Sequence, residues 1–190
     1  MTAMCDVAFL LLTFFILTAK PRTEDPVPVD IPAATTEIPI PDDNMLMLTV
    51  GQGKVFFSVD GNDVRKQTLT QMGDKYGIKF TAEQQEKFSG LPVFGVPLKQ
   101  LGGFLDLDAE GRKAFQQSGI PSDTTANNEL ADWIRESRRV VVSLHNRALR
   151  ISIKGDNKEE YPTIKKLIGV LQKQKINKFS LITTVKSEAK

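Results

Sequence analysis

The chain opens with an apolar run over residues 1–19 that carries one charged side chain, that of Asp6. A helix of this length reaches about 28 Å, close to the roughly 30 Å hydrocarbon core of a bilayer. A carboxylate near the middle of such a span costs about 2.5–3.5 kcal/mol on insertion scales, so it usually faces a partner helix or a water path. The sequence therefore predicts a transmembrane helix over residues 1–19, with Asp6 as a candidate proton-binding residue.

Two hydroxyl side chains share a helical face with Asp6. Thr2 stands four residues before it and Thr13 seven residues after it, which places all three on one side of a helix. The rest of the surface is apolar and suits lipid or a tightly packed helix, while hydroxyls can form hydrogen bonds between helices. We expect an interior seam between several chains, in which Thr2 and Thr13 line the proton route.

A signal peptide is the plain alternative for this run. Such a peptide begins with basic residues and ends at a small-x-small cleavage site. No basic residue precedes the run, and the segment from Thr18 to Pro21 is a poor cleavage site. Because Asp6 lies so close to the start, we expect a basic tail and a first helical turn upstream of the given sequence. Cys5 beside it is interpreted as a packing residue.

Composition limits the rest of the chain only broadly. With 190 residues, 41% hydrophobic content and a net charge of +2, the chain has room for one anchor and one modest domain, and its charge does not require nucleic acid. Six of the ten prolines fall within residues 20–44, at positions 21, 26, 28, 32, 39 and 41. This composition predicts an extended linker that tethers a domain or docks as a strand on a partner's edge.

The remaining residues predict a small α+β domain with an inserted segment. A β-hairpin over 45–60 and a strand-helix-strand unit, with strands at 149–154 and 175–183, should form its sheet, and the last two strands should be parallel neighbours. A helix over 128–137 precedes that unit. The domain is thus assigned to residues 45–65 and 128–186. Short helices over 67–76, 82–88, 98–105 and 109–117 give residues 66–127 the character of a helical insertion.

No constellation in the sequence favours an enzyme, a cofactor or a metal ion. Gly51 and Gly53 lack the spacing of a phosphate loop and are better interpreted as a turn. Asp106 and Asp108 imitate the opening of a calcium loop, but Gln117 stands where the closing glutamate would be, so Asp108 is interpreted as a helix cap. Lone Trp133 and lone His145 are interpreted as a packing residue and a surface residue.

The order of these segments resembles the ExbD/TolR family, the single-pass proton-channel subunits of Ton-type and Tol-type envelope motors. The resemblance is carried by the apolar helix with its aspartate at residues 4–18 and by the segment VDIPAA at residues 29–34. The hairpin at 45–60 and the strand-helix-strand unit at 149–184 are similar to the family's periplasmic domain. Shorter members of the family lack the segment at about 66–127.

The resemblance implies a motor subunit of the cell inner membrane with its C-terminal domain in the periplasm. Asp6 would be the protonatable carboxylate, and two copies of the chain would lie inside a ring of an ExbB-like subunit in the lipid bilayer. A partner-binding linker motif, made of Val29, Ile31, Pro32 and Ala34, would engage a TonB-like energy transducer. The expected function is proton-motive-force-driven energising of TonB-dependent transport across the outer membrane.

Two alternatives stay open at this point. A TolR-like subunit would serve envelope constriction and would bind peptidoglycan through its soluble domain. A membrane-tethered scaffold or binding protein would use Asp6 only for a hydrogen bond between helices, without proton chemistry. Lys20 and Arg22, counted literally, would place the C-terminal part in the cytoplasm; the resemblance implies the periplasm instead.

Overall fold

The computed structural model describes residues 2–18, 44–122, 128–155 and 161–183. A four-stranded sheet has the order β2-β1-β3-β4, in which β1 pairs antiparallel with β2 and parallel with β3, and β3 pairs parallel with β4. The strands are β1 (Met45–Gly51), β2 (Lys54–Val59), β3 (Arg150–Gly155) and β4 (Ser180–Thr183). The predicted α+β class and the parallel pairing of the last two strands are confirmed.

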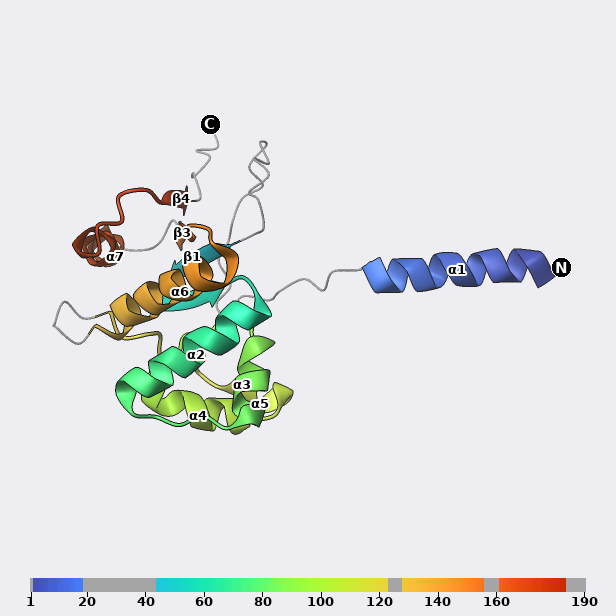
Figure 1. The fold of residues 1–190 in the computed structure, drawn as a ribbon, viewed down its shortest axis with the longest axis horizontal. Coiled ribbons are helices and arrows are strands. Elements are labelled where there is room, and N and C mark those ends of the chain that lie inside the picture. The colour runs from blue at the N-terminus through green and yellow to red at the C-terminus, as the bar shows by residue number, and fades with distance from the viewer. Residues whose placement is uncertain (1, 19–43, 123–127, 156–160, 184–190) are drawn as a thin grey trace, which may run out of the picture.

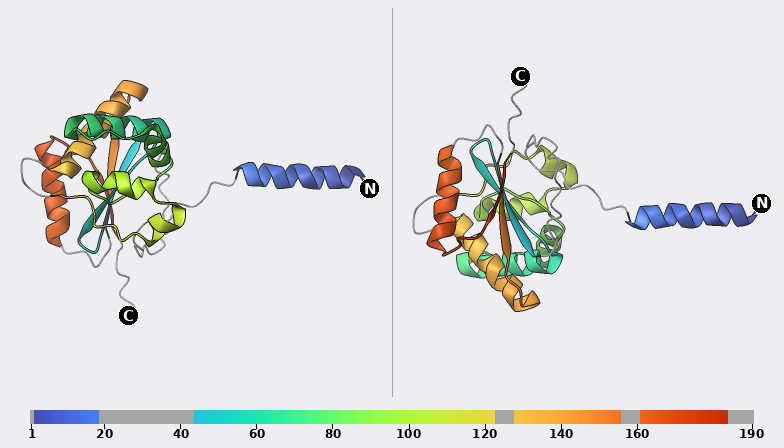
Figure 2. Two further views of the ribbon diagram at one scale, coloured as in Figure 1. Left: turned by 90° about the horizontal axis from the view of Figure 1, so that it is seen from below. Right: turned by 90° about the horizontal axis from the view of Figure 1, so that it is seen from above.

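The described ranges contain seven helices besides the sheet (Figure 1). They are α1 (Thr2–Thr18), α2 (Asn62–Tyr76), α3 (Ala82–Ser89), α4 (Leu98–Asp106), α5 (Ala109–Ala114), α6 (Glu129–His145) and α7 (Tyr161–Lys173). In both views of Figure 2, α7 lies on one side of the strands and α3 and α5 lie on the other. Helices α3 and α5 therefore do not share a side of the sheet with α7.

The hairpin turn explains the antiparallel start of the sheet. Gln52 and Gly53 both have positive φ angles, 56° and 71°. Positive φ at both central residues is typical of a type I′ turn, whose twist matches that of the flanking strands. The predicted turn at Gly51 and Gly53 is thus confirmed as the connection between β1 and β2.

One hydrophobic core joins the sheet to the helices that follow it. Leu46, Leu48 and Val50 on alternate positions of β1 are fully buried, as the period of two predicts for a strand with one face in the core. Residues of the predicted insertion enter the same core, among them Phe88 of α3 and Phe94 after it. That residues 66–127 are an insertion relative to shorter family members stays a prediction.

The outer edge of β2 is closed by the chain itself. Phe57 and Phe94 exchange two backbone hydrogen bonds of 2.8 and 3.0 Å, and the amide of Ile120 donates to the carbonyl of Val55 at 2.9 Å. Gly119, with a φ of 86°, permits a close approach, because a Cβ there would lie 3.0 Å from the Cβ of Lys54. Covering an edge in this way removes a template for pairing with another chain.

Two helices are longer than predicted. Helix α2 begins at Asn62 rather than at residue 67, and its first turn is anchored by buried Val64 and by Arg65, which donates to the carbonyl oxygens of Ser89 and Val59. Helix α6 was predicted to end at residue 137 but continues to His145, since Val140 and Val141 extend its buried stripe. Tertiary contacts decided both ends.

Two elements are shorter than predicted. Helix α5 ends at Ala114 instead of residue 117, because Phe115 is extended and packs its ring 5.3 Å from that of Phe104. Strand β4 begins at Ser180 instead of residue 175, because Lys175 has a φ of 59° and closes a turn after α7.

The predicted cap at Asp108 and the predicted placements of Trp133 and His145 are confirmed. Thr81 forms a capping box with Gln84, and the side chain of Asp108 accepts a 2.7 Å hydrogen bond from the amide of Gly111. Trp133 is fully buried and His145 lies at the surface. Asp108 therefore acts as the N-cap of α5.

Candidate functional site

Helix α1 presents one carboxylate on an otherwise uncharged surface. Asp6 is the one charged residue among its 17 residues, and its side chain is exposed. Large apolar side chains cover the rest of the helix and are exposed as well: Met4, Val7, Phe9, Leu10, Leu11, Leu12, Phe14, Phe15, Ile16 and Leu17. Such a surface needs a partner or an apolar solvent to cover it.

The described part of the chain includes no helix with both the length and the apolar character needed to cross a membrane. The predicted transmembrane span over residues 1–19 is therefore not confirmed.

The three predicted residues of the proton route lie on one helix. Thr2 is its first residue, and Asp6 and Thr13 follow at positions that share a face. The hydroxyl of Thr13 donates to the carbonyl oxygens of Phe9 and Leu10, at 3.0 and 2.9 Å. Only the lone pairs of this hydroxyl are therefore left for a contact outside the helix. That Thr2 and Thr13 line a pore stays a prediction.

The predicted linker lies outside the described residues up to position 43. Its partner-binding motif, made of Val29, Ile31, Pro32 and Ala34, therefore receives no structural description and stays a prediction. The linker's last residue, Asn44, is described.

Asn44 connects the chain entering β1 to three other elements. Its carbonyl oxygen accepts a 3.0 Å hydrogen bond from the amide of Arg150 in β3, and its side-chain oxygen contacts Nδ1 of His145 at the end of α6. Nε2 of His145 lies 3.1 Å from Oδ2 of Asp63 in the first turn of α2. The point at which the linker enters the domain is thus tied to β3, α6 and α2 together.

The carboxylate of Asp63 titrates at a lower pH than an ordinary aspartate. Burial acts to raise its pKa, but the hydrogen bonds from the backbone of Val64 and from His145 outweigh this effect and lower the pKa. Asp63 therefore stays ionised at neutral pH, where it can hold His145 in place.

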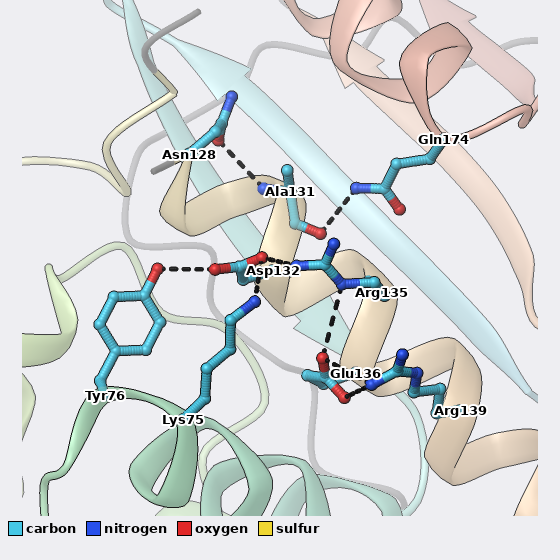
Figure 3. A network of polar contacts seen from close by, with 9 residues as sticks. All are labelled: Lys75, Tyr76, Asn128, Ala131, Asp132, Arg135, Glu136, Arg139 and Gln174. Atoms are coloured by element: carbon cyan, nitrogen blue, oxygen red, sulfur yellow. Dashed lines mark hydrogen bonds and ion pairs between the residues drawn. The ribbon is translucent and has the colours of Figure 1, made fainter. Parts of the chain in front are cut away.

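A polar network centred on Asp132 joins α2 to α6 (Figure 3). Asp132 is only 7% exposed. Its Oδ2 accepts a 2.8 Å hydrogen bond from the hydroxyl of Tyr76, and its Oδ1 pairs with Lys75 Nζ at 2.5 Å and with Arg135. A buried carboxylate is tolerable when it is paired and hydrogen-bonded in this way.

The network continues along α6 through Glu136, which is 5% exposed. Its carboxylate lies 3.5 Å from Arg135 Nε and 3.1 Å from a terminal nitrogen of Arg139. Burial and the nearby cation of Arg135 lower the pKa of Lys75, while burial and the carboxylate of Glu129 raise the pKa of Tyr76. At neutral pH the tyrosine therefore keeps the proton that it donates to Asp132.

The same helix is fastened on its other sides. Gln174, after α7, donates a 2.6 Å hydrogen bond from Nε2 to the carbonyl oxygen of Ala131. Glu129 accepts from the amide of Leu98, at 2.8 Å, and from the indole nitrogen of Trp133, at 3.3 Å. Burial raises the pKa of Glu129 despite these two hydrogen bonds. Helix α6 is thus linked to α2, α4 and the end of α7, so force applied to one element reaches the others.

Sequence reasoning missed this network, although a signal was present. Asp132, Arg135, Glu136 and Arg139 recur at helical spacings of three and four residues, which place opposite charges on one face of a helix. Their partners Lys75 and Tyr76 lie more than 50 residues earlier, on a helix whose packing against α6 the sequence does not reveal.

The comparisons with known proteins gave one family. Residues 1–89 match the family described as biopolymer transport protein ExbD/TolR. The match runs through α1, the hairpin, α2 and α3. Neither the curated proteins nor the solved structures gave a significant match.

Proposed function

We propose that this chain is a motor subunit of the ExbD/TolR type that uses the proton-motive force, because its residues 1–89 match the family described as biopolymer transport protein ExbD/TolR. A subunit of this type would be a non-enzymatic protein of the inner membrane that is associated with biopolymer transport and works with ExbB/TolQ-like and TonB/TolA-like partners. In the proposal, α1 anchors the chain and the residues after the linker lie in the periplasm. The observation that carries the proposal is Asp6, the one charge on α1.

The physical basis is the cost of charge in an apolar surrounding. One elementary charge that crosses a potential of 100 mV releases about 2.3 kcal/mol, and protonation of Asp6 removes most of its penalty for facing an apolar surface. Proton binding therefore changes which surface of a surrounding ring α1 prefers. Alternate protonation of two Asp6 side chains in a homodimer would turn the pair inside an ExbB-like ring.

The linker transmits this motion to the periplasmic domain in the proposed mechanism. It ends at Asn44, whose contacts with β3 and α6 connect the tether to the rigid part of the domain. Val29, Ile31, Pro32 and Ala34 would engage a TonB-like transducer. The ion pairs around Asp132 keep α2 and α6 together when force reaches them.

The test is substitution of Asp6 in cells that also express the ring partner. Asp6→Asn removes the titratable group with little change in size, so growth on a substrate that needs energised outer-membrane uptake should be lost while a pull-down still recovers the complex. Asp6→Glu should retain part of the growth, because it keeps a carboxylate. Full growth of Asp6→Asn would refute the proton-binding role and would leave the tethered scaffold as the better explanation.

A TolR-like role is the second candidate, because the matching family description names ExbD and TolR together. This role predicts that a Tol-type rather than a Ton-type transducer is recovered with the chain, and that the domain binds peptidoglycan. Loss of the chain would then cause a division or leakage defect. Identification of the transducer recovered in the same pull-down distinguishes the two roles.

A further inference from the structure

A pocket of about 810 Å³ lies between β2, the end of α3 and the segment from α5 to Gln117. Its volume falls within the range of about 300–1,000 Å³ that is usual for small-ligand sites. Five of its seventeen lining residues lie at or before Lys87 and twelve lie at or after Gly90. The pocket is therefore built mostly from residues beyond the family match, which ends at residue 89.

Three phenylalanines line the pocket. Phe56 and Phe104 are almost fully buried and form the wall behind it, so the partly buried ring of Phe115, which packs edge to face against Phe104 with 5.3 Å between the ring centroids, is the aromatic surface that a ligand can reach. The ring of Phe56 packs directly against Gly95, where a Cβ would lie only 2.3 Å from the ring. Fixed aromatic rings of this kind can receive the apolar body of a ligand.

The charged residues that line the pocket are mainly basic. They are Lys54, Lys87, Arg112 and Lys113, with Glu86 as the one carboxylate among the lining residues. Glu86 already pairs with Lys66 at 3.2 Å, Lys87 pairs with Glu83 at 2.9 Å, and Lys54 donates to the carbonyl oxygen of Gln117 at 3.0 Å. The side chain of Arg112 has no ion pair or hydrogen bond within the described part of the chain.

Arg112 is therefore the group best suited to receive an anion. A guanidinium is planar and can bind the two oxygens of a carboxylate with two parallel hydrogen bonds. The neighbouring lysines add positive potential, but an ammonium group does not offer the two parallel N–H donors of a guanidinium. An anion with one carboxylate and a compact apolar body matches both the basic rim and the aromatic surface.

We propose that this pocket binds a small organic carboxylate, whose carboxylate pairs with Arg112 and whose apolar body packs on the ring of Phe115. The site is separate from Asp6 and from the network around Asp132. It is independent of the proposed motor function, because Asp6 is not among the residues that line the pocket.

The probe for this site is 4-phenylbutyrate, titrated calorimetrically into the full chain in detergent micelles. Saturable binding that strengthens at low ionic strength is expected, whereas neutral 4-phenylbutyramide should bind at least about tenfold more weakly, because it lacks the charge that pairs with the guanidinium. Equal binding of the acid and the amide, or no saturable binding of the acid, would overturn the proposal.

Substitutions then locate the site. Arg112→Gln should weaken binding of the acid by about tenfold. Arg112→Lys should recover only part of the loss, since a lysine cannot bind both carboxylate oxygens with two parallel hydrogen bonds. Lys79→Gln is the matched control, because Lys79 is exposed and does not line the pocket. An unchanged affinity for Arg112→Gln, or an equal loss for the control, would also refute the assignment. Thermal unfolding of each variant verifies its fold, and the comparison of acid with amide needs no variant.

Discussion

The hydroxyl of Tyr76 donates a 2.8 Å hydrogen bond to Oδ2 of Asp132, which joins the last residue of α2 to the first turn of α6. The two residues are 56 positions apart. Lys75 and Arg135 bind the other carboxylate oxygen, so the charge of Asp132 is balanced from both helices. This contact makes α2 and α6 one mechanical unit.

Tyr76→Phe removes this hydrogen bond without removing the ring. We expect the free energy of unfolding to fall by about 1.5 kcal/mol, since a hydrogen bond to a charged group contributes about 1.5–3 kcal/mol. Urea denaturation of the full chain measures the change. Thr70→Val is the control, because Thr70 is exposed and its hydroxyl bonds to the carbonyl oxygen of Lys66 in its own helix; a loss as large in this variant would show that the effect is not specific to Asp132.

Glu129→Gln should make the domain more stable at neutral pH. Burial raises the pKa of Glu129 above its unfolded value, so ionisation of the carboxylate costs stability as the pH rises through the interval between the two pKa values. Glutamine keeps an oxygen that can accept from the amide of Leu98 and the indole of Trp133. The gain should vanish below about pH 4.5, where the unfolded glutamate is also protonated.

Thermal unfolding at pH 7 and at pH 4 gives the comparison for this substitution. A stabilisation of the same size at both pH values would mean that shape or hydrogen bonding, and not ionisation, causes the effect. A destabilised variant at pH 7 would contradict the prediction outright.

Gly95→Ala should destabilise the domain by about 1–3 kcal/mol, because the new Cβ would lie 2.3 Å from the ring of Phe56 and would overpack a buried site. Gly103→Ala is the matched substitution in helix α4, where a Cβ meets no atom within 4 Å. Alanine there should stabilise the helix by about 0.5–1 kcal/mol. Opposite signs in chemical denaturation are therefore expected; a neutral Gly95→Ala would mean that Phe56 moves aside readily.

The sequence predicted the elements of the domain better than their ends. The hairpin and the last two strands follow from alternating residues and turn glycines, and the cap at Asp108 follows from its position before a helix. The lengths of α2 and α6 depend on contacts made elsewhere, such as Arg65 with the carbonyl of Ser89. Local patterns do not contain that information.

The candidate functional residues divide in the same way. Asp6 stands out in the sequence because charge is rare in an apolar run, whereas Arg112 and Phe104 have no pattern that marks them as neighbours. The pocket exists because Phe115 leaves the helical path and meets Phe104. The periodicity of the sequence predicted a helix that continues to residue 117, and a helical Phe115 gave no reason to expect a pocket at this position.

In the proposed motor, Thr13→Val should reduce growth on a substrate that needs energised uptake only modestly, in contrast to Asp6→Asn. The hydroxyl proton of Thr13 is already donated to the carbonyl oxygens of Phe9 and Leu10, so substitution removes only an acceptor. A hydrogen bond between membrane helices contributes about 0.6 kcal/mol on average, which corresponds to about threefold in an equilibrium. Thr18→Val is the control, because Thr18 bonds in the same way to Phe14 but lies on another face of the helix. If Thr13→Val abolished growth while Thr18→Val did not, the lone pairs of Thr13 would be essential to the proton route.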